Sequence, residues 1–298
     1  KEFFSMWGDI AIAFLLAFIT AFVITPYSIR LAKKVGAVDY PNDRRVNKKP
    51  MPRLGGIAVI AGFLVSAIYL IITMRIENNI DFITDGLGKK LLGFLFGAMV
   101  LGITCYIDDV KGISPLVKLA GQLIAAIIVV SCGVRIDNFT IPFKENSIMI
   151  NEVISYILTI GWIVGITNAI NLIDGLDGLS SGITLIACIS MLIIFSLNES
   201  PLIAIILITA LAGAIVGFLP YNFNPAKTFI GDVGSNFMGY AISIISILGV
   251  AKTYTAIVII APIIVLALPI FDTLWAIVRR IVKTKSIKGV FKADKGHL

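Results

Sequence analysis

The sequence predicts an all-α fold, a polytopic bundle of transmembrane helices with no separate soluble domain. Its 298 residues are 58% hydrophobic and 14% charged, and the mean hydropathy is +0.96. A soluble domain averages about 25% charged residues. The core of a soluble protein could not bury this much apolar surface, whereas a bilayer can cover it. Apolar runs close to the roughly 20 residues that cross the hydrocarbon recur along the whole chain.

Nine such runs are candidate spans. They cover residues 11–29, 55–74, 91–107, 116–130, 153–170, 179–197, 202–219, 237–250 and 255–278. The first run is too long, and lacks the flanks, for a cleaved signal peptide. Alternating polar residues around Thr140 and Pro142 predict a small hairpin within residues 133–151. We expect one integral membrane catalytic domain over residues 1–298, cut short at the C-terminus of a longer chain of about 10–11 spans.

Lys and Arg are divided unequally between the two sides that nine spans define. The loops after the first, third, fifth, seventh and ninth runs hold 18 of the 25 basic residues. The positive-inside rule therefore predicts that the N-terminus lies outside and that these five loops are cytoplasmic. The net charge of +7 is then explained by loops facing anionic lipid, and no nucleic-acid partner is needed.

Two adjacent acids, Asp108 and Asp109, directly follow the third apolar run. They lie at the C-terminal end of the expected helix, where the helix dipole disfavours anions by roughly 0.3–1 kcal/mol each. A solvated helix end with Lys111 and Lys118 as counterions is the plain alternative. A pair placed against both the dipole and mutual repulsion favours a functional role.

A second polar cluster follows the fifth run, at residues 168–178. It combines amides, carboxylates and glycines without a basic residue: Asn168, Asn171, Asp174, Gly175, Asp177 and Gly178. Beside lipid, a bound cation would neutralise it, and a set of oxygen ligands favours magnesium or manganese over zinc. A simple Gly-Asp turn is the alternative. His297 is the only histidine, so a Cys/His zinc site and a Ser-His-Asp triad are both excluded.

Two further inner loops carry candidate substrate-binding residues. Lys227 and Asp232 belong to a loop with glycine and serine that enters the eighth run, an arrangement that fits a phosphate cradle. The first inner loop holds eight basic residues, Lys49 and Arg53 among them, and ends in Pro50-Met-Pro-Arg-Leu-Gly-Gly56. A pure topology signal would explain its charge but not this terminal run. Together the four loops predict transfer at a diphosphate, where cations must screen two anionic substrates.

A secondary transporter would also be polytopic with broken helices near its binding groups. Here the candidate carboxylates lie in loops or at helix ends on one side, and no predicted span has a charge at its centre. The positions of these residues therefore favour an enzyme over a transporter.

Three of these segments resemble the signature loops of a known family. The Asp108-Asp109 pair, the 168–178 segment and the 225–235 segment look like those of the polyprenyl-phosphate N-acetylhexosamine-1-phosphate transferases, glycosyltransferase family 4, in the same order. The resemblance covers nearly the whole chain. It implies a bacterial plasma-membrane enzyme with a cytoplasmic active site, a UDP-sugar donor, a polyprenyl phosphate acceptor, release of UMP and Mg²⁺, with Mn²⁺ as the alternative ion. It leaves a homodimer open.

The resemblance also implies a role for individual residues. The implied assignments are Asn171 and Asp232 on the metal, Asp177 with Gly175 at uracil, Asp108 and Asp109 as the catalytic pair, Lys118 on phosphate, and Asp174 as essential with a less settled role; Lys49, Arg53, Asn168 and Lys227 are further substrate-binding candidates. One departure is Val233, where the family motif commonly has Thr, so a hydroxyl contact is absent there.

The end of the chain bears on the sugar. Asp294 and His297 lie in a segment similar to the sugar-recognising loop of the N-acetylglucosamine-1-phosphate branch, and residues 268–273 also look like that branch. The resemblance therefore implies UDP-N-acetylglucosamine and undecaprenyl phosphate as substrates. UDP-N-acetylmuramoyl-pentapeptide or another UDP-N-acetylhexosamine is the alternative donor, and the polymer made downstream stays open.

Overall fold

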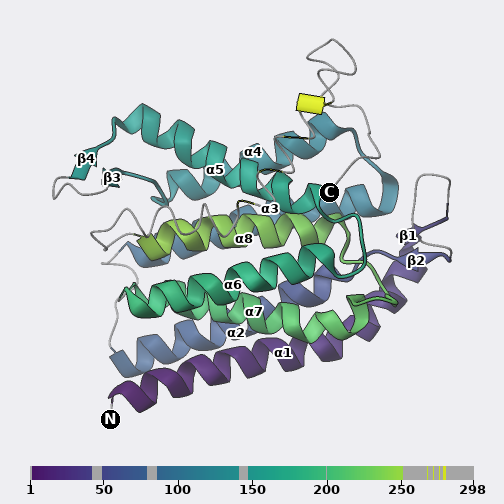
Figure 1. Ribbon diagram of the computed structural model, residues 1–298, viewed down its shortest axis with the longest axis horizontal. Helices are drawn as coiled ribbons and strands as arrows, with labels where there is room; N and C mark the ends of the chain where they lie inside the picture. The colour runs from purple at the N-terminus through teal and green to yellow at the C-terminus, as the bar shows by residue number, and fades with distance from the viewer. Residues whose placement is uncertain are drawn as a thin grey trace.

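The computed structural model describes residues 2–41, 49–78, 86–140, 147–198 and 200–250, with the isolated positions 267, 271, 275, 278 and 279. Eight long helices make up most of this described part (Figure 1). They are α1 (Glu2–Val35), α2 (Gly56–Asn78), α3 (Leu87–Lys111), α4 (Pro115–Ser131), α5 (Glu152–Leu172), α6 (Leu179–Leu197), α7 (Leu202–Asn222) and α8 (Gly231–Val250). The predicted helical fold is confirmed.

Two short antiparallel ribbons lie at opposite ends of the bundle (Figure 1). β1 (Val38–Asp39) pairs with β2 (Met51–Pro52), and β3 (Asn138–Thr140) pairs with β4 (Ser147–Met149). The second ribbon confirms the hairpin predicted within residues 133–151. The first, which lies between α1 and α2, was not predicted, because its two-residue strands carry no alternating pattern.

Five of the described helices are long and apolar enough to cross a membrane. They are Gly8–Val35 within α1, together with α3, α5, α6 and α7; Gly56–Tyr69 and Pro115–Ser131 are shorter apolar helices. The described residues thus support a membrane protein without establishing nine spans. The eighth predicted span falls in α8, whose first turns carry Asp232, Ser235 and Asn236. The ninth, 255–278, lies outside the described residues apart from four isolated positions.

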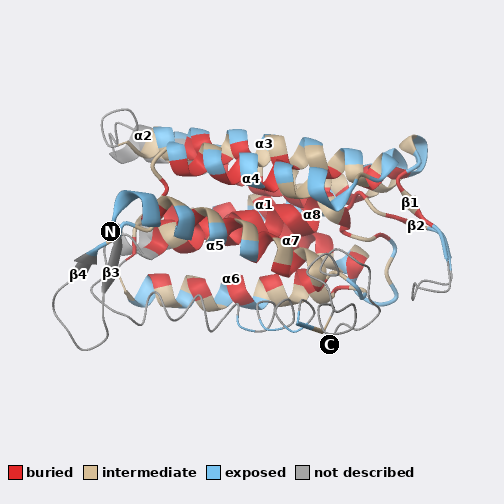
Figure 2. Cartoon of the chain, turned by 90° about the horizontal axis from the view of Figure 1, so that it is seen from above, coloured by how far each residue is buried: buried red, intermediate tan, exposed pale blue. Residues whose placement is uncertain are grey.

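The buried core of the bundle is centred on α7 and α8 (Figure 2). α1 packs against α2 and α7, α3 against α4 and α8, α5 against α8, and α6 against α7. The outer faces of the surrounding helices instead expose large apolar side chains, such as Leu15, Ile103, Ile157 and Ile186. Contiguous apolar faces of this kind are costly in water and are covered by lipid chains in a membrane.

Successive helices run in opposite directions, so their connections alternate between two ends (Figure 1). The α1–α2, α3–α4, α5–α6 and α7–α8 connections meet at one end. Local sequence determines where the helices begin. Ser114 caps α4 by accepting a hydrogen bond from the Val117 amide at 3.4 Å, and Pro115 is the first residue of that helix. Gly178, at φ +70°, precedes α6 in a conformation that favours glycine. The four loops singled out in the sequence therefore lie together at one end of the bundle.

Candidate active site

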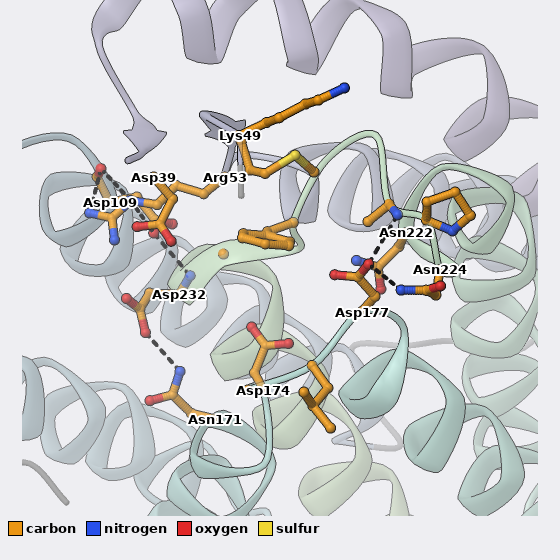
Figure 3. A pocket seen from close by; sticks show the side chains of 17 residues that line it. Asp39, Lys49, Arg53, Asp109, Asn171, Asp174, Asp177, Asn222, Asn224 and Asp232 are labelled. Carbon is orange, nitrogen blue, oxygen red and sulfur yellow. Dashed lines mark hydrogen bonds and ion pairs between the residues drawn. The ribbon is translucent and has the colours of Figure 1, made fainter. Parts of the chain in front are cut away.

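A cavity of about 980 Å³ lies where the four connections meet (Figure 3). Its lining is contributed by every one of them: Asp39, Lys49, Met51 and Arg53 from the first, Asp109 from the end of α3, Asn171, Asp174, Gly175, Leu176 and Asp177 from the third, and Asn222, Asn224, Pro225, Ala226, Phe229, Gly231 and Asp232 from the fourth. Carboxylates and amides dominate the polar part of this wall. Residues far apart in the sequence therefore form one site.

Asp109 joins the end of one helix to the start of another. Its carboxylate accepts hydrogen bonds from the backbone amides of Asp232, at 3.1 Å, and Val233, at 2.9 Å, so it caps the N-terminus of α8. Arg53 donates to the Asp109 carbonyl at 2.8 and 3.0 Å and to the Asp108 carbonyl at 3.2 Å. The guanidinium thus satisfies the last carbonyls of α3, and its charge complements the dipole there.

Asp108 is directed differently from its neighbour. Oδ1 accepts from the backbone amide of Ile113 at 2.9 Å, and Oδ2 lies 3.4 Å from Lys118 Nζ. Consecutive helical side chains diverge by about 100°, so the pair serves two separate environments. Asp109 stabilises the junction of α3 and α8, while Asp108 faces the ammonium of Lys118.

Lys118 is the centre of an oxygen cluster. Its Nζ donates to Asn171 Oδ1 at 3.0 Å and to Asp232 Oδ1, and it also faces Asp108. Asn171 Nδ2 in turn donates to Asp232 Oδ1 at 2.7 Å and to Ser235 Oγ at 2.8 Å. A cation, the lysine ammonium, therefore already lies among the side-chain oxygens predicted to hold a metal.

The donor set fits a hard divalent ion. Oxygens of Asn171 and Asp232 converge on one position, and oxygen ligands suit Mg²⁺ and Mn²⁺. Among the described residues, no three His, Cys, Asp or Glu side chains form a metal-binding group. An ion here would therefore depend on one amide and one carboxylate, completed by water and substrate phosphate, which is the usual mode for magnesium.

The other side of the cavity is formed by the α5–α6 connection. Burial raises the pKa of Asp174 to about 7, although a hydrogen bond from Ser180 Oγ at 2.6 Å opposes that rise. Asp177 Oδ2 accepts from Asn224 Nδ2 at 3.0 Å and from the Ala226 amide at 3.1 Å. Two carboxylates three residues apart thus have different environments, Asp177 being held to the α7–α8 loop (Figure 3).

Most of the predicted site residues meet at this end. The cavity is lined by Lys49, Arg53, Asp109, Asn171, Asp174, Gly175, Asp177 and Asp232, while Asp108 and Lys118 are in contact with the lining. Asn168 lies one turn deeper, hydrogen-bonded to Gln122. Lys227 lies over the Tyr221 ring, 5.7 Å from its centre. Asp294 and His297 lie outside the described residues.

Several cavity residues were not predicted from the sequence. Asp39, Asn222, Asn224 and Phe229 all line the wall. Asn222 and Asn224 lie directly before the 225–235 segment, so a search for amides beside it would have found them. Asp39, one of the aspartates on the predicted inner side, reaches the cavity through the unpredicted β1–β2 ribbon.

Comparison with known proteins identifies a family and relatives of this chain. Residues 91–250 match the family described as Glycosyl transferase family 4. A Bacillus subtilis protein described as a probable undecaprenyl-phosphate N-acetylglucosaminyl 1-phosphate transferase is 43% identical over 97% of this chain and 76% of its own length. The decaprenyl-phosphate N-acetylglucosaminephosphotransferase of Mycobacterium tuberculosis is 34% identical over 95% of this chain and 72% of its own.

A second kind of relative matches less of this chain. The phospho-N-acetylmuramoyl-pentapeptide-transferase of Staphylococcus epidermidis is 34% identical over 80% of this chain and 74% of its own length. The family match spans α3 to α8, and therefore the carboxylates and amides of the cavity from Asp108 to Asp232. On the extent of these matches, the chain belongs to glycosyl transferase family 4.

Proposed function

We propose that this membrane enzyme transfers N-acetylglucosamine 1-phosphate from UDP-N-acetylglucosamine to undecaprenyl phosphate, giving undecaprenyl-diphosphate-N-acetylglucosamine and UMP. The observation that carries the proposal is one cavity lined by carboxylates and amides from four loops, in a chain 43% identical to a probable transferase of this specificity. The reaction is a sugar-phosphate transfer in which both substrates are anionic.

The two sides of the cavity divide the work of binding. Asp177, held by Asn224 and the Ala226 amide, offers a fixed acceptor for the N–H of a base such as uracil. Lys118 at the other side supplies positive charge for phosphate oxygens. The α8 N-terminus beside it adds backbone amides to that field. The nucleotide of the donor would therefore lie across the cavity, with its diphosphate toward α8.

The chemical step needs one bond made and one broken. An oxygen of the lipid phosphate attacks the phosphorus nearer the sugar, and the bond from that phosphorus to the bridging oxygen breaks. UMP leaves with the bridging oxygen and the electron pair. Because a phosphate monoester is largely ionised near pH 7, the nucleophile needs little help from a base. Asp108 then acts chiefly by orienting Lys118, which neutralises charge on the diphosphate.

Asn171 and Asp232 would hold a Mg²⁺ or Mn²⁺ ion. When bound, such an ion polarises phosphoryl oxygens and offsets their charge. This chain's own residues orient that pair: Ser235 Oγ accepts from Asn171, and Asp109 fixes the backbone at Asp232. The wall around it is acidic, with Asp174 and Asp177 facing the same cavity, so cations are needed before a diphosphate can enter.

Orientation in the membrane follows from charge. If nine spans are counted, the loops on the side of the cavity hold 18 of the 25 Lys and Arg, seven of them after the ninth span, which supports a cytoplasmic active site in a bacterial plasma membrane. UDP-sugars would reach the cavity from that side, and the lipid acceptor from the bilayer. We keep a homodimer as part of the proposal.

A donor panel tests the proposal. Purified protein in lipid is mixed with undecaprenyl phosphate, Mg²⁺ and one UDP-sugar at a time, and UMP release is measured. UMP should form with UDP-N-acetylglucosamine, stop in excess chelator and return when Mg²⁺ is restored. Because one group of relatives acts on the muramoyl-pentapeptide donor, UDP-N-acetylmuramoyl-pentapeptide is the second donor. UMP from that donor alone would replace the proposed substrate, and none from any donor would end the proposal.

A further inference from the structure

A second polar layer lies one helical turn below the cavity. Gln122 follows Lys118 by four residues on α4, Asn168 precedes Asn171 by three on α5, and Asn236 follows Asp232 by four on α8; each pair is therefore stacked on its helix. Both Gln122 and Asn236 are buried, with 2% and 0% of their surface exposed. Three amides thus share the interior with apolar side chains, directly behind the cluster around Lys118.

The amides are bonded to one another across three helices. Gln122 Nε2 donates to Asn236 Oδ1 at 2.7 Å and to Asn168 Oδ1 at 3.3 Å, and Gln122 Oε1 accepts from Asn168 Nδ2 at 2.6 Å. Both hydrogens of the glutamine amide are used, and its oxygen is used as well. The second hydrogen of Asn168 Nδ2 bonds the Val164 carbonyl at 2.9 Å. Within this layer, Gln122 therefore ties α4 to both α5 and α8, as Lys118 does one turn above.

The layer also reaches the cavity residues. Asn236 Nδ2 donates to the backbone carbonyl of Asp232 at 2.8 Å. Asn168 and Asn171 share one turn of α5, and Lys118 and Gln122 share one turn of α4. A shift of any of these helices along its axis would break bonds in the amide layer and would also separate Lys118, Asn171 and Asp232. Buried networks of this kind hold well only when every member is satisfied.

We propose that Gln122 is a positioning residue for the transfer reaction, which sets the register of α4, α5 and α8 so that the oxygens of Asn171 and Asp232 converge beside Lys118. The inference rests on the proposed function for its kinetic arm only. Outer partners of metal ligands act in this way elsewhere, and their loss costs roughly 10–100-fold in metal affinity or activity. Gln122 was not predicted as functional, since it lies inside an apolar run.

The main variant is Gln122→Met, which keeps the length of the side chain and removes its amide. We expect kcat to fall roughly tenfold or more, with the KM of the UDP-sugar within about twofold of wild type, because the nucleotide side of the cavity is untouched. Mn²⁺ binding, followed by electron paramagnetic resonance without substrate, should weaken roughly tenfold. A milder variant, Asn236→Ala, leaves the Gln122–Asn168 pair intact and should change both quantities in the same direction, by less.

The matched control is Tyr240→Phe. Tyr240 is fully buried on α8, the helix of Asn236, and its hydroxyl donates to the Phe94 carbonyl of α3 at 3.0 Å. Its loss should lower the Tm of the protein about as much as Gln122→Met, while kcat and Mn²⁺ affinity stay near wild type. Near-normal kcat and Mn²⁺ affinity in Gln122→Met, or equal losses in Tyr240→Phe, would overturn the proposal. If Gln122→Met does not fold, Asn236→Ala decides between the same outcomes. If wild type releases no UMP, the proposed function fails, and Mn²⁺ binding alone decides this inference.

Discussion

Adjacent acids at the end of α3 have separate surroundings in the folded protein. Asp109 is 1% exposed, and both its oxygens accept backbone amides from α8. Asp108 is partly buried and faces Lys118. A carboxylate that is used to cap a helix has little freedom to act on a substrate, whereas one beside the Lys118 ammonium can influence charge at the diphosphate. We therefore assign stability chiefly to Asp109 and turnover chiefly to Asp108.

Substitution at each acid separates these roles. Asp109→Ala removes the cap of α8 and should lower the free energy of unfolding by about 1–2 kcal/mol, the upper range for lost caps. Asp108→Asn keeps an oxygen for the Ile113 amide, so stability should hold, but turnover should fall roughly 100-fold, with donor binding little changed. Tm and UMP-release kinetics are measured on both. Equal stability losses, or normal turnover in Asp108→Asn, would contradict the assignment.

Lys118 competes with a divalent ion for the oxygens of Asn171 and Asp232. A unit charge about 4 Å away is worth roughly 1–4 kcal/mol at a protein surface. Lys118→Met should therefore tighten Mn²⁺ binding at least about fivefold. Turnover should fall, because the substrate phosphate no longer has the Lys118 ammonium beside it. Titration of Mn²⁺ by electron paramagnetic resonance checks the first effect. Lys111→Met, an exposed lysine at the same end, is the control and should leave Mn²⁺ binding unchanged. Weaker Mn²⁺ binding in Lys118→Met would show that the lysine supports the ion instead.

Asp174 makes stability depend on pH. Its pKa is about 7 in the folded protein and near 3.8 in the unfolded chain. Between these values the folded state binds more protons, so stability falls as pH rises through that window. Asp174→Asn keeps an acceptor for Ser180 and removes the penalty. Measured without divalent ions, the variant should have a higher Tm than wild type at pH 8 and a clearly smaller excess at pH 5, where only the lower part of the window has been crossed. A difference in Tm that is the same at both values would contradict the raised pKa.

At the residue scale, the sequence predicted the polar residues of the cavity and missed the buried amides that hold them in place. Asp108, Asn171 and Asp232 stood out because they interrupt or border apolar runs. Gln122 lies within the fourth run and Asn236 directly precedes the eighth, and a single polar side chain at such a place predicts nothing until its partner is known. The partners come from helices 114 residues apart in sequence. Contacts of that range follow from packing, which local patterns do not encode.

At the scale of elements, the first turns of α2 and α8 approach each other closely at two glycines. A Cβ at Gly56 would overlap the backbone N and Cα of Gly234. The Gly56 amide also donates to the Ile230 carbonyl at 2.7 Å, directly before α8. The Gly55-Gly56 pair, which a topology signal could not explain, is thus needed for α2 to lie against the start of α8. Helix positions followed from hydrophobicity, but this contact required the structure.

Gly56→Ala should separate α2 from α8 and displace Asp232 with it. We expect a loss of about 1–3 kcal/mol, typical of overpacking, and a fall in UMP release. Gly102→Ala, on α3 with open space at its Cβ, is the matched control. It should stabilise the protein by about 0.5–1 kcal/mol, because alanine favours a helix interior. Tm values and the elution profile in detergent distinguish the two. A Gly56→Ala protein as stable as Gly102→Ala would contradict the close approach.

At the scale of the whole molecule, the exposed apolar side chains and the helix connections both define the long axis of the bundle. Large apolar side chains cover the outer faces along the bundle, and the polar cavity lies at one end. The sequence predicted which loops share that end, since alternation of helices is all that this requires. The ninth predicted run lies outside the described residues apart from isolated positions, so it stays a prediction. The side of the membrane that the cavity faces follows from Lys and Arg alone and stays a prediction.

Single cysteines at exposed positions test that prediction. Tyr40 and Phe223 lie at the cavity end, and Met149 and Leu197 lie at the other end. In a background with Cys105, Cys132 and Cys188 replaced by alanine, a membrane-impermeant maleimide should label the first pair only in inside-out vesicles and the second only in right-side-out vesicles. The reverse pattern would keep the bundle and refute the cytoplasmic site. Labelling of Phe223 and Leu197 from one side would refute the alternation itself, because α6 and α7 would then not both cross the membrane.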